Sequence, residues 1–168
     1  MCSSDLSHHY VFDYLLDEIL ARQTAEIRRF LLFTSILDQL TAPLCDALLK
    51  EEATPSRASG VILAELERAN LFILSLDHER RWYRYHHLFS DLLRLMLPQN
   101  YPRLGPELHR RACRWYEAQG MLPEALQHAI SAGDMQLVAQ IVSVNVLLLV
   151  ENDEIAPTLK KNRCAAAG

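Results

Sequence analysis

Two adjacent histidines, His86 and His87, are the side chains of this sequence best placed to do chemistry. They follow a run of strand-forming aromatic residues and precede a run of leucines at helical spacing. The first backbone N–H groups of a helix have no partner inside it, and the helix dipole is positive at that end. A histidine at a strand-to-helix junction can therefore donate to an anion, and we treat this pair as a candidate anion site.

The sequence shows none of the motifs that metal binding, nucleophilic catalysis or nucleotide binding would need. The seven histidines form no HExxH motif and no pair spaced by four, so we expect no metal site. No serine or cysteine lies in a GxSxG context, and the five glycines form no GxxxxGK[ST] phosphate loop. The cysteines are widely spaced, as expected of reduced thiols: Cys2, Cys45, Cys113 and Cys164. We predict that the chain is not an enzyme.

The segment before the histidines predicts a β-hairpin. Residues 70–76 and 82–86 are rich in apolar and aromatic residues, and neither run is long enough to bury them as a helix. A charged turn of four or five residues separates them. A hairpin between two helical segments is typical of a winged helix.

The basic tip of this hairpin could be a DNA-contacting wing. It carries His78, Arg80 and Arg81, with Arg84 close behind. A solvated turn, or a contact to a neighbouring domain, is the interpretation that we favour. The preceding helix, expected over residues 60–69, is acidic on balance, and phosphates would repel it.

Helices surround the hairpin. The apolar spacing predicts helices over residues 9–21, from Thr24 onward, over 44–49 and over 88–97. Residues 50–58 read as a loop, after which Ser56 or Ser59 can cap the helix that precedes the hairpin.

Residues 98–102, with two prolines, mark a boundary, and helical hairpins follow it. Helices are expected over 105–119, 124–132 and 136–146, with Gly120 and Gly133 ending the first two and Asp134 capping the third. Arg110, Arg111 and Arg114 form a basic stripe that we expect to be exposed. Residues 137–150 are apolar on more than one face but too short to span a bilayer, so we expect a buried helix.

Composition restricts the class of protein. Of 168 residues, 50% are apolar, and the formal charge of −4 gives no electrostatic reason to expect tight binding to nucleic acid. The polar start of the chain shows no signal peptide. We expect a cytoplasmic protein with no membrane partner.

Several phrases together resemble one family. They are YVFDYL at 10–15, LFTSILD at 32–38, PLCDAL at 43–48, LERANLF at 66–72, WYRYHHLF at 82–89 and LHRRA at 108–112. In this order they resemble the large MalT-like, ATP-dependent LuxR-type transcriptional regulators, which are signal-transduction ATPases of the STAND class. The family's order is nucleotide-binding domain, winged helix, tetratricopeptide-like sensor, then a helix-turn-helix. The resemblance covers about residues 7–154, the middle of such a regulator.

The resemblance implies a role for the histidine pair. In related nucleotide-switch ATPases a Met-His-Asp motif at this junction places its histidine on the β-phosphate of ADP. His86 falls at that position, and His87 stands where the acid would be. ATP or ADP would bind the parent protein, and this fragment would hold no cofactor of its own. The implied partner is the nucleotide-binding domain of the same parent chain, and self-association of the parent is left open.

These inferences define the expected protein. The fold class is mainly α: a winged helix with one β-hairpin over residues 1–97, then tetratricopeptide-like antiparallel helices over 98–168 with a disordered tail. The expected function is a regulatory middle segment that couples nucleotide state to signal sensing. A stand-alone DNA-binding winged-helix regulator and a structural helical adaptor are the alternatives.

Overall fold

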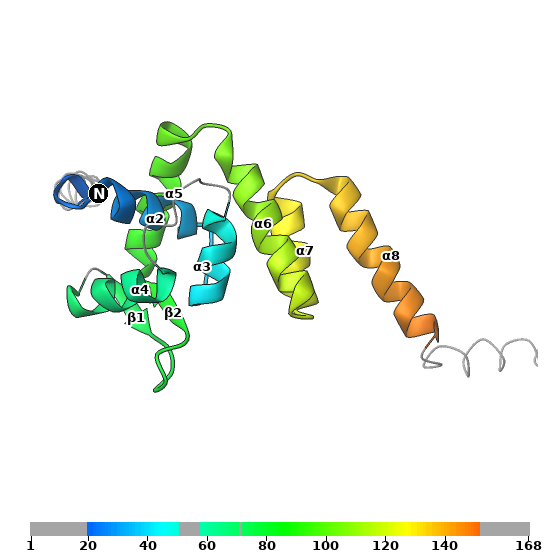
Figure 1. Cartoon of the computed structure of the whole chain (residues 1–168). Helices are drawn as coiled ribbons and strands as arrows, with labels where there is room; N and C mark the ends of the chain where they lie inside the picture. The colour runs from blue at the N-terminus through cyan, green and yellow to red at the C-terminus, as the bar shows by residue number, and fades with distance from the viewer. Residues whose placement is uncertain (1–19, 51–57, 71, 152–168) are drawn as a thin grey trace, which may run out of the picture.

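The computed structural model describes residues 20–50, 58–70 and 72–151 of the chain. It is mainly α, with one β-hairpin, as the sequence predicted (Figure 1). The elements run in this order: α2 (Ala25–Thr34), α3 (Ala42–Leu49), α4 (Ser59–Arg68), β1 (Ile73–Ser75), β2 (Tyr83–Tyr85), α5 (His87–Asn100), α6 (Leu104–Ala118), α7 (Leu122–Ser131) and α8 (Met135–Glu151). The helix expected over 9–21 lies mostly outside the described residues, as does the tail after residue 151.

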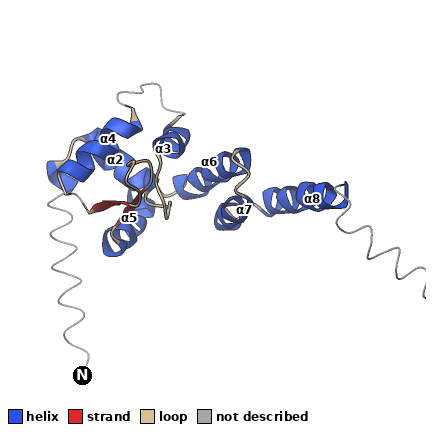
Figure 2. Ribbon diagram, turned by 90° about the horizontal axis from the view of Figure 1, so that it is seen from below, coloured by secondary structure: helices blue, strands red, loops and turns tan. Residues whose placement is uncertain are grey.

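The predicted hairpin is confirmed. Strands β1 and β2 pair antiparallel, and Figure 2 shows them as the red pair beside α5. The pairing continues beyond the strands at both ends. Leu76 N–H donates to the Trp82 carbonyl (2.8 Å), and His86 N–H donates to the Phe72 carbonyl (2.7 Å). Residues 77–81 are left as a five-residue turn, within the predicted length.

Two further contacts attach this hairpin to the helices. Tyr83 and Leu40 exchange backbone hydrogen bonds of 2.9 and 2.7 Å, so the segment between α2 and α3 pairs with β2. The buried hydroxyls of Thr34 on α2 and Tyr85 on β2 lie 2.7 Å apart, and Thr34 also donates to the Phe30 carbonyl (2.7 Å). The hairpin is therefore held by main-chain and side-chain bonds as well as by packing.

One apolar core runs through the winged helix into α6 and α7. Its fully buried members include Phe30 and Phe33 of α2, Leu63 of α4 and Phe89 of α5. Buried residues of the following helices belong to the same cluster, among them Leu108, Ala112, Tyr116 and Ala125. Since α6 packs on α3 and α5 of the winged helix, and α7 packs on α6, the two predicted parts of the chain share this core.

Both predicted glycine stops end their helices. Gly120 has a positive φ of 72°, which a residue without a Cβ adopts at little cost. Its N–H donates to the Glu117 carbonyl and the Met121 N–H to the Tyr116 carbonyl, which is a Schellman motif. Gly133, with φ 68°, ends α7 in the same way. The turn at Gly120 reverses the chain so that α6 and α7 form an antiparallel pair, and the turn at Gly133 leads from α7 into α8.

Helix α5 runs beyond residue 97, where the apolar spacing placed its end. Helix α5 continues to Asn100 and contains Pro98. A proline in the last turn removes one N–H, and the helix then closes with a bond from Tyr101 N–H to the Leu97 carbonyl (2.7 Å). The predicted helix end was three residues early, whereas the break between α5 and α6 overlaps the range 98–102 in which the sequence placed a boundary.

The predicted cap of α4 is also wrong. The residue at the N-cap is Ala58, and no side chain makes a cap bond. Asp46 on α3 instead accepts a bond from Ser59 N–H (3.2 Å), while the buried Ser59 hydroxyl has no described partner. Ser56, the other candidate, lies outside the described residues. An acceptor from a neighbouring helix has taken the place of a local cap.

Helix α8 is not the buried helix that its composition suggested. Ile141 is buried, but Met135 is 69% exposed and Val142 45%. Among the described residues α8 packs chiefly on α7 (Figure 1), and Val144 is exposed as well, while the side chains of residues 145–150 lie outside the described part. No described helix has the length and apolar character needed to cross a membrane.

Candidate functional site

The structure places the two histidines at the predicted junction. His86 is the N-cap residue of α5, directly after β2, and its carbonyl accepts from Ser90 N–H (3.0 Å). His86 is partly buried and His87 is exposed, with the two ring centroids 4.5 Å apart. The hydrogen bond from His86 N–H to the Phe72 carbonyl, described above, fixes the backbone position of His86 at the end of the hairpin.

The ring of His86 has no hydrogen-bond partner in the part of the domain that the structure describes. Its side chain makes no cap bond to α5, and no described residue forms a hydrogen bond with either ring nitrogen. No acidic residue lies in the first turn of α5. An imidazole that has no described hydrogen-bond partner and lies at the positive end of a 14-residue helix has the chemistry of an anion contact.

The basic turn of the hairpin is shaped by one carboxylate. Asp77 Oδ1 accepts from the N–H groups of Arg81 (2.9 Å) and Trp82 (3.1 Å). Arg80 lies 3.6 Å from Glu67 on α4, and Arg81 pairs with Glu79. Each guanidinium of the turn therefore has a carboxylate beside it, which reduces the positive charge that a DNA-contacting wing needs.

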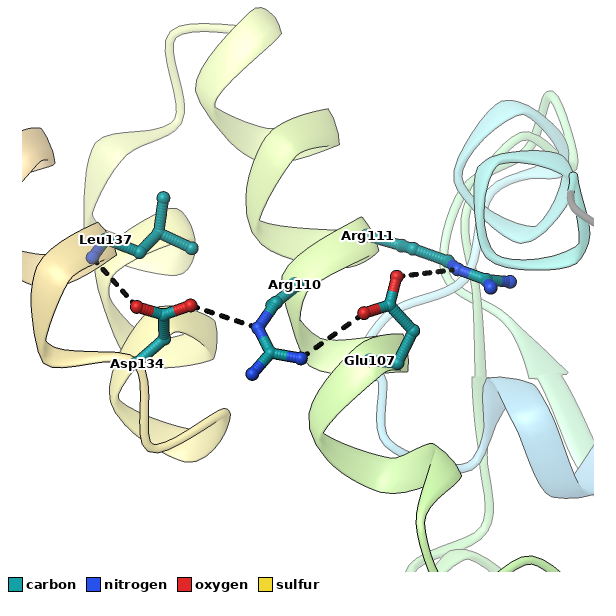
Figure 3. A network of polar contacts seen from close by, with 5 residues as sticks. All are labelled: Glu107, Arg110, Arg111, Asp134 and Leu137. Carbon is teal, nitrogen blue, oxygen red and sulfur yellow. Dashed lines mark hydrogen bonds and ion pairs between the residues drawn. The ribbon is translucent and has the colours of Figure 1, made fainter.

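The basic stripe expected on the surface of α6 is largely engaged. Only Arg114 is exposed; the Arg111 side chain is 11% exposed and that of Arg110 35%. Both belong to a network drawn in Figure 3, with Glu107 between them. Glu107 accepts from Arg110 (3.3 Å) and from Arg111 (3.4 Å). The helical repeat places residues 107, 110 and 111 on one face, a pattern that the stripe reading overlooked.

This network extends beyond α6 in both directions. Arg110 Nε donates to Asp134 Oδ2 (3.0 Å), and Asp134 Oδ1 accepts from Leu137 N–H (3.1 Å), which confirms the predicted cap of α8. Arg111 Nη1 donates to the Leu48 carbonyl at the end of α3 (2.7 Å). Salt-linked side chains thus connect the start of α8, through α6, to the winged helix (Figure 3).

A histidine pair that the sequence did not single out joins α6 to α7. The Nδ1 atoms of His109 and His128 lie 2.8 Å apart, which requires one donor and one acceptor tautomer. Burial lowers the pKa of His128 to about 4, with His109 adding to the effect. Burial and the positive charge of Arg94 lower the pKa of His109. Both rings are therefore neutral at pH 7.

These rings line a pocket of about 370 Å³ between the winged helix and the α6–α7 pair. Arg94 and Asp38, which form an ion pair of 2.7 Å, are on the opposite wall. No group of three metal-ligating side chains occurs in the described part of the chain. Spacing alone could not have revealed this pair, because residues 109 and 128 are on different helices.

The fold defines the class of protein: a winged helix whose hairpin is followed by antiparallel helices. Residues 16–105 match the MalT winged helix domain family, and the chain belongs to that family. Among curated proteins it is similar to the "HTH-type transcriptional regulator MalT" of Klebsiella pneumoniae subsp. pneumoniae and of Klebsiella pneumoniae strain 342. Each is 36% identical over 133 residues, which cover 79% of this chain. The chain spans 14% of the length of each relative.

Proposed function

We propose that this chain is the regulatory middle segment of a cytoplasmic MalT-like, LuxR-family transcriptional regulator of the STAND class. The family match supports the winged-helix part of this proposal, and the printed name of both relatives supports a role in transcription regulation. In the parent protein this segment would bind the nucleotide-binding domain and couple its ATP or ADP state to a tetratricopeptide-like sensor. Self-association of the parent would fit the same scheme.

The observation that carries the proposal is the free ring of His86 at the start of α5. An N–H donor can stabilise a phosphate only if it reaches one, and this ring is partly exposed and has no hydrogen-bond partner among the described residues. We assign His86 as the residue that contacts the β-phosphate of ADP in the resting parent. His87, more exposed beside it, would support that contact.

The polar network on α6 supports the relay. Arg111 holds the end of α3 while Arg110 holds Asp134 at the start of α8, and Glu107 joins the two arginines. A change in the sensor helices would thereby shift the winged helix, and with it His86. The surface that the nucleotide-binding domain covers would then change as well.

The test is His86→Ala in the full-length parent. Loss of a charge-assisted bond to phosphate costs about 1.5–3 kcal/mol, so ADP binding should weaken about ten- to a hundredfold. Transcription without inducer should rise, because the ADP-bound resting state is lost. The measurements are ADP titration by calorimetry and a reporter assay.

His78→Ala is the matched control, because His78 is exposed in the hairpin turn, away from α5. It should leave both readouts unchanged. If His86→Ala keeps the thermal stability and the ADP affinity of the parent, the nucleotide-sensing role is lost.

A further inference from the structure

A second pocket, of about 350 Å³, lies where the hairpin turn meets α3, α4 and α6. Its volume is within the range of small-molecule sites. Apolar side chains make much of its wall, including Pro43, Leu63, Trp82 and Trp115. His86 is not among the lining residues, so the nucleotide-sensing role described above does not use this pocket.

The tryptophans indicate the shape of the ligand. The chain contains two, Trp82 and Trp115, and both line this pocket. Each tryptophan is only partly buried, although large aromatic side chains contribute most to stability or binding when they are fully covered. A concave wall that presents two indole rings suits a flat, apolar partner that can stack on them.

The arginines indicate its charge. Arg80 and Arg81 also line the pocket, and their side chains are 67% and 71% exposed. The pair of Arg81 with Glu79 is exposed on both sides and contributes little to stability, because water screens it and the side chains lose entropy. A ligand carboxylate can therefore take the place of Glu79 at small cost.

One helix start adds to the positive potential. Ala42, the first residue of α3, lines the pocket, and α3 has no acid in its first turn. Gly60, near the start of α4, also lines the pocket, but Asp46 bonds the Ser59 N–H there and already offsets that dipole. The dipole of α3 therefore favours an anion in this pocket.

The turn is held in shape before any ligand binds. The two bonds to Asp77 described above fix the backbone of Arg81 and Trp82. Arg80 has a φ of 53°, the left-handed region that costs a residue with a Cβ. Strain of this kind is found at ligand-binding positions, because the surrounding bonds must impose it.

We propose that this pocket binds a small planar aromatic carboxylate. The ring stacks on Trp82 and Trp115, and the carboxylate contacts the guanidinium groups of Arg80 and Arg81. Bound there, the ligand bridges the hairpin and α6. This proposal stands apart from nucleotide sensing, since it involves neither His86 nor the nucleotide-binding domain.

The experiment uses the 168-residue chain and benzoate as the probe, followed by tryptophan fluorescence excited at the red edge of the indole band. Benzoate should quench the emission to saturation. The variants Trp82→Phe and Trp115→Phe each leave one reporter, and benzoate should quench the emission of both variants. Benzamide, which is neutral and similar in shape, should bind about three- to tenfold more weakly.

A matched pair of substitutions tests the contact itself. Arg81→Gln should raise the Kd of benzoate about three- to tenfold. Arg84→Gln removes the same charge from an exposed position on β2 outside the pocket, and should leave the Kd unchanged. The proposal is overturned by equal affinity for benzamide and benzoate, by equal effects of the two substitutions, or by a response from only one tryptophan.

Discussion

Arg111 on α6 donates a hydrogen bond of 2.7 Å to the carbonyl of Leu48, at the C-terminal end of α3. The last carbonyls of a helix have no partner inside it, and a guanidinium both satisfies one and complements the negative end of the dipole. Helix α6, which follows the winged helix in the chain, thus satisfies a carbonyl at the end of α3, which lies within the winged helix. The first prediction concerns this contact.

Replacing Arg111 with methionine should lower the free energy of unfolding by about 1–3 kcal/mol, because the Leu48 carbonyl and Glu107 lose a charged donor. Arg114→Met, at an exposed position of the same helix, should change it by less than about 0.5 kcal/mol. Urea unfolding of the two variants provides the comparison. Equal values would show that the bond contributes nothing to the packing of α6.

Thr34→Val should destabilise the protein more than Tyr85→Phe. The Thr34 hydroxyl donates to the Phe30 carbonyl and so accepts from Tyr85. Tyr85→Phe removes that donor and leaves Thr34 bonded, at a cost of about 0.5–1.5 kcal/mol. Thr34→Val leaves the buried Tyr85 hydroxyl without an acceptor, at a cost of about 1–3 kcal/mol. Thermal or urea unfolding distinguishes the two, and the reverse order would contradict the assigned donor.

Stability should fall as the pH falls below about 6.5, the ordinary pKa of histidine. The pKa of His128 is lowered to about 4 in the folded chain by burial. Between these values the unfolded chain binds the extra proton, so stability is fully present above pH 6.5 and is lost progressively towards pH 4. The loss should be about 3 kcal/mol, from a shift of about 2.5 pKa units. Urea unfolding at several pH values measures it.

His128→Gln cannot titrate, and its stability should depend less on pH in this window. The parent and the variant are compared by the slope of unfolding free energy against pH, so that a uniform loss of stability in the variant does not matter. Identical slopes would show that other groups cause the acid sensitivity.

The isolated chain should bind duplex DNA only non-specifically, with a Kd weaker than about 10⁻⁶ M at physiological salt. The net charge is −4, and Glu67 and Glu79 lie beside the arginines of the hairpin turn. A gel-shift titration against specific and random duplexes tests this. Sequence-selective binding at nanomolar protein would favour a stand-alone DNA-binding regulator.

Local patterns in the sequence predicted much of this fold. The change of period near His86 located the hairpin and the start of α5, because strand and helix need different spacings of apolar residues. Gly120 and Gly133 end their helices because a residue without a Cβ adopts a positive φ at little cost, whatever its tertiary surroundings. The sequence also placed His86 and His87 correctly between the hairpin and α5, because that position follows from the residues next to them in the chain.

Contacts between distant residues were decided by the tertiary structure. The bond from Asp46 to the start of α4 and the pairing of Leu40 with Tyr83 have no local signal. The sequence alone determined which segments are helices, where the hairpin turns and which histidines stand at the junction. Only packing decided that Arg111 reaches Leu48 and that His109 meets His128, because a side chain's partner depends on how separate helices are brought together.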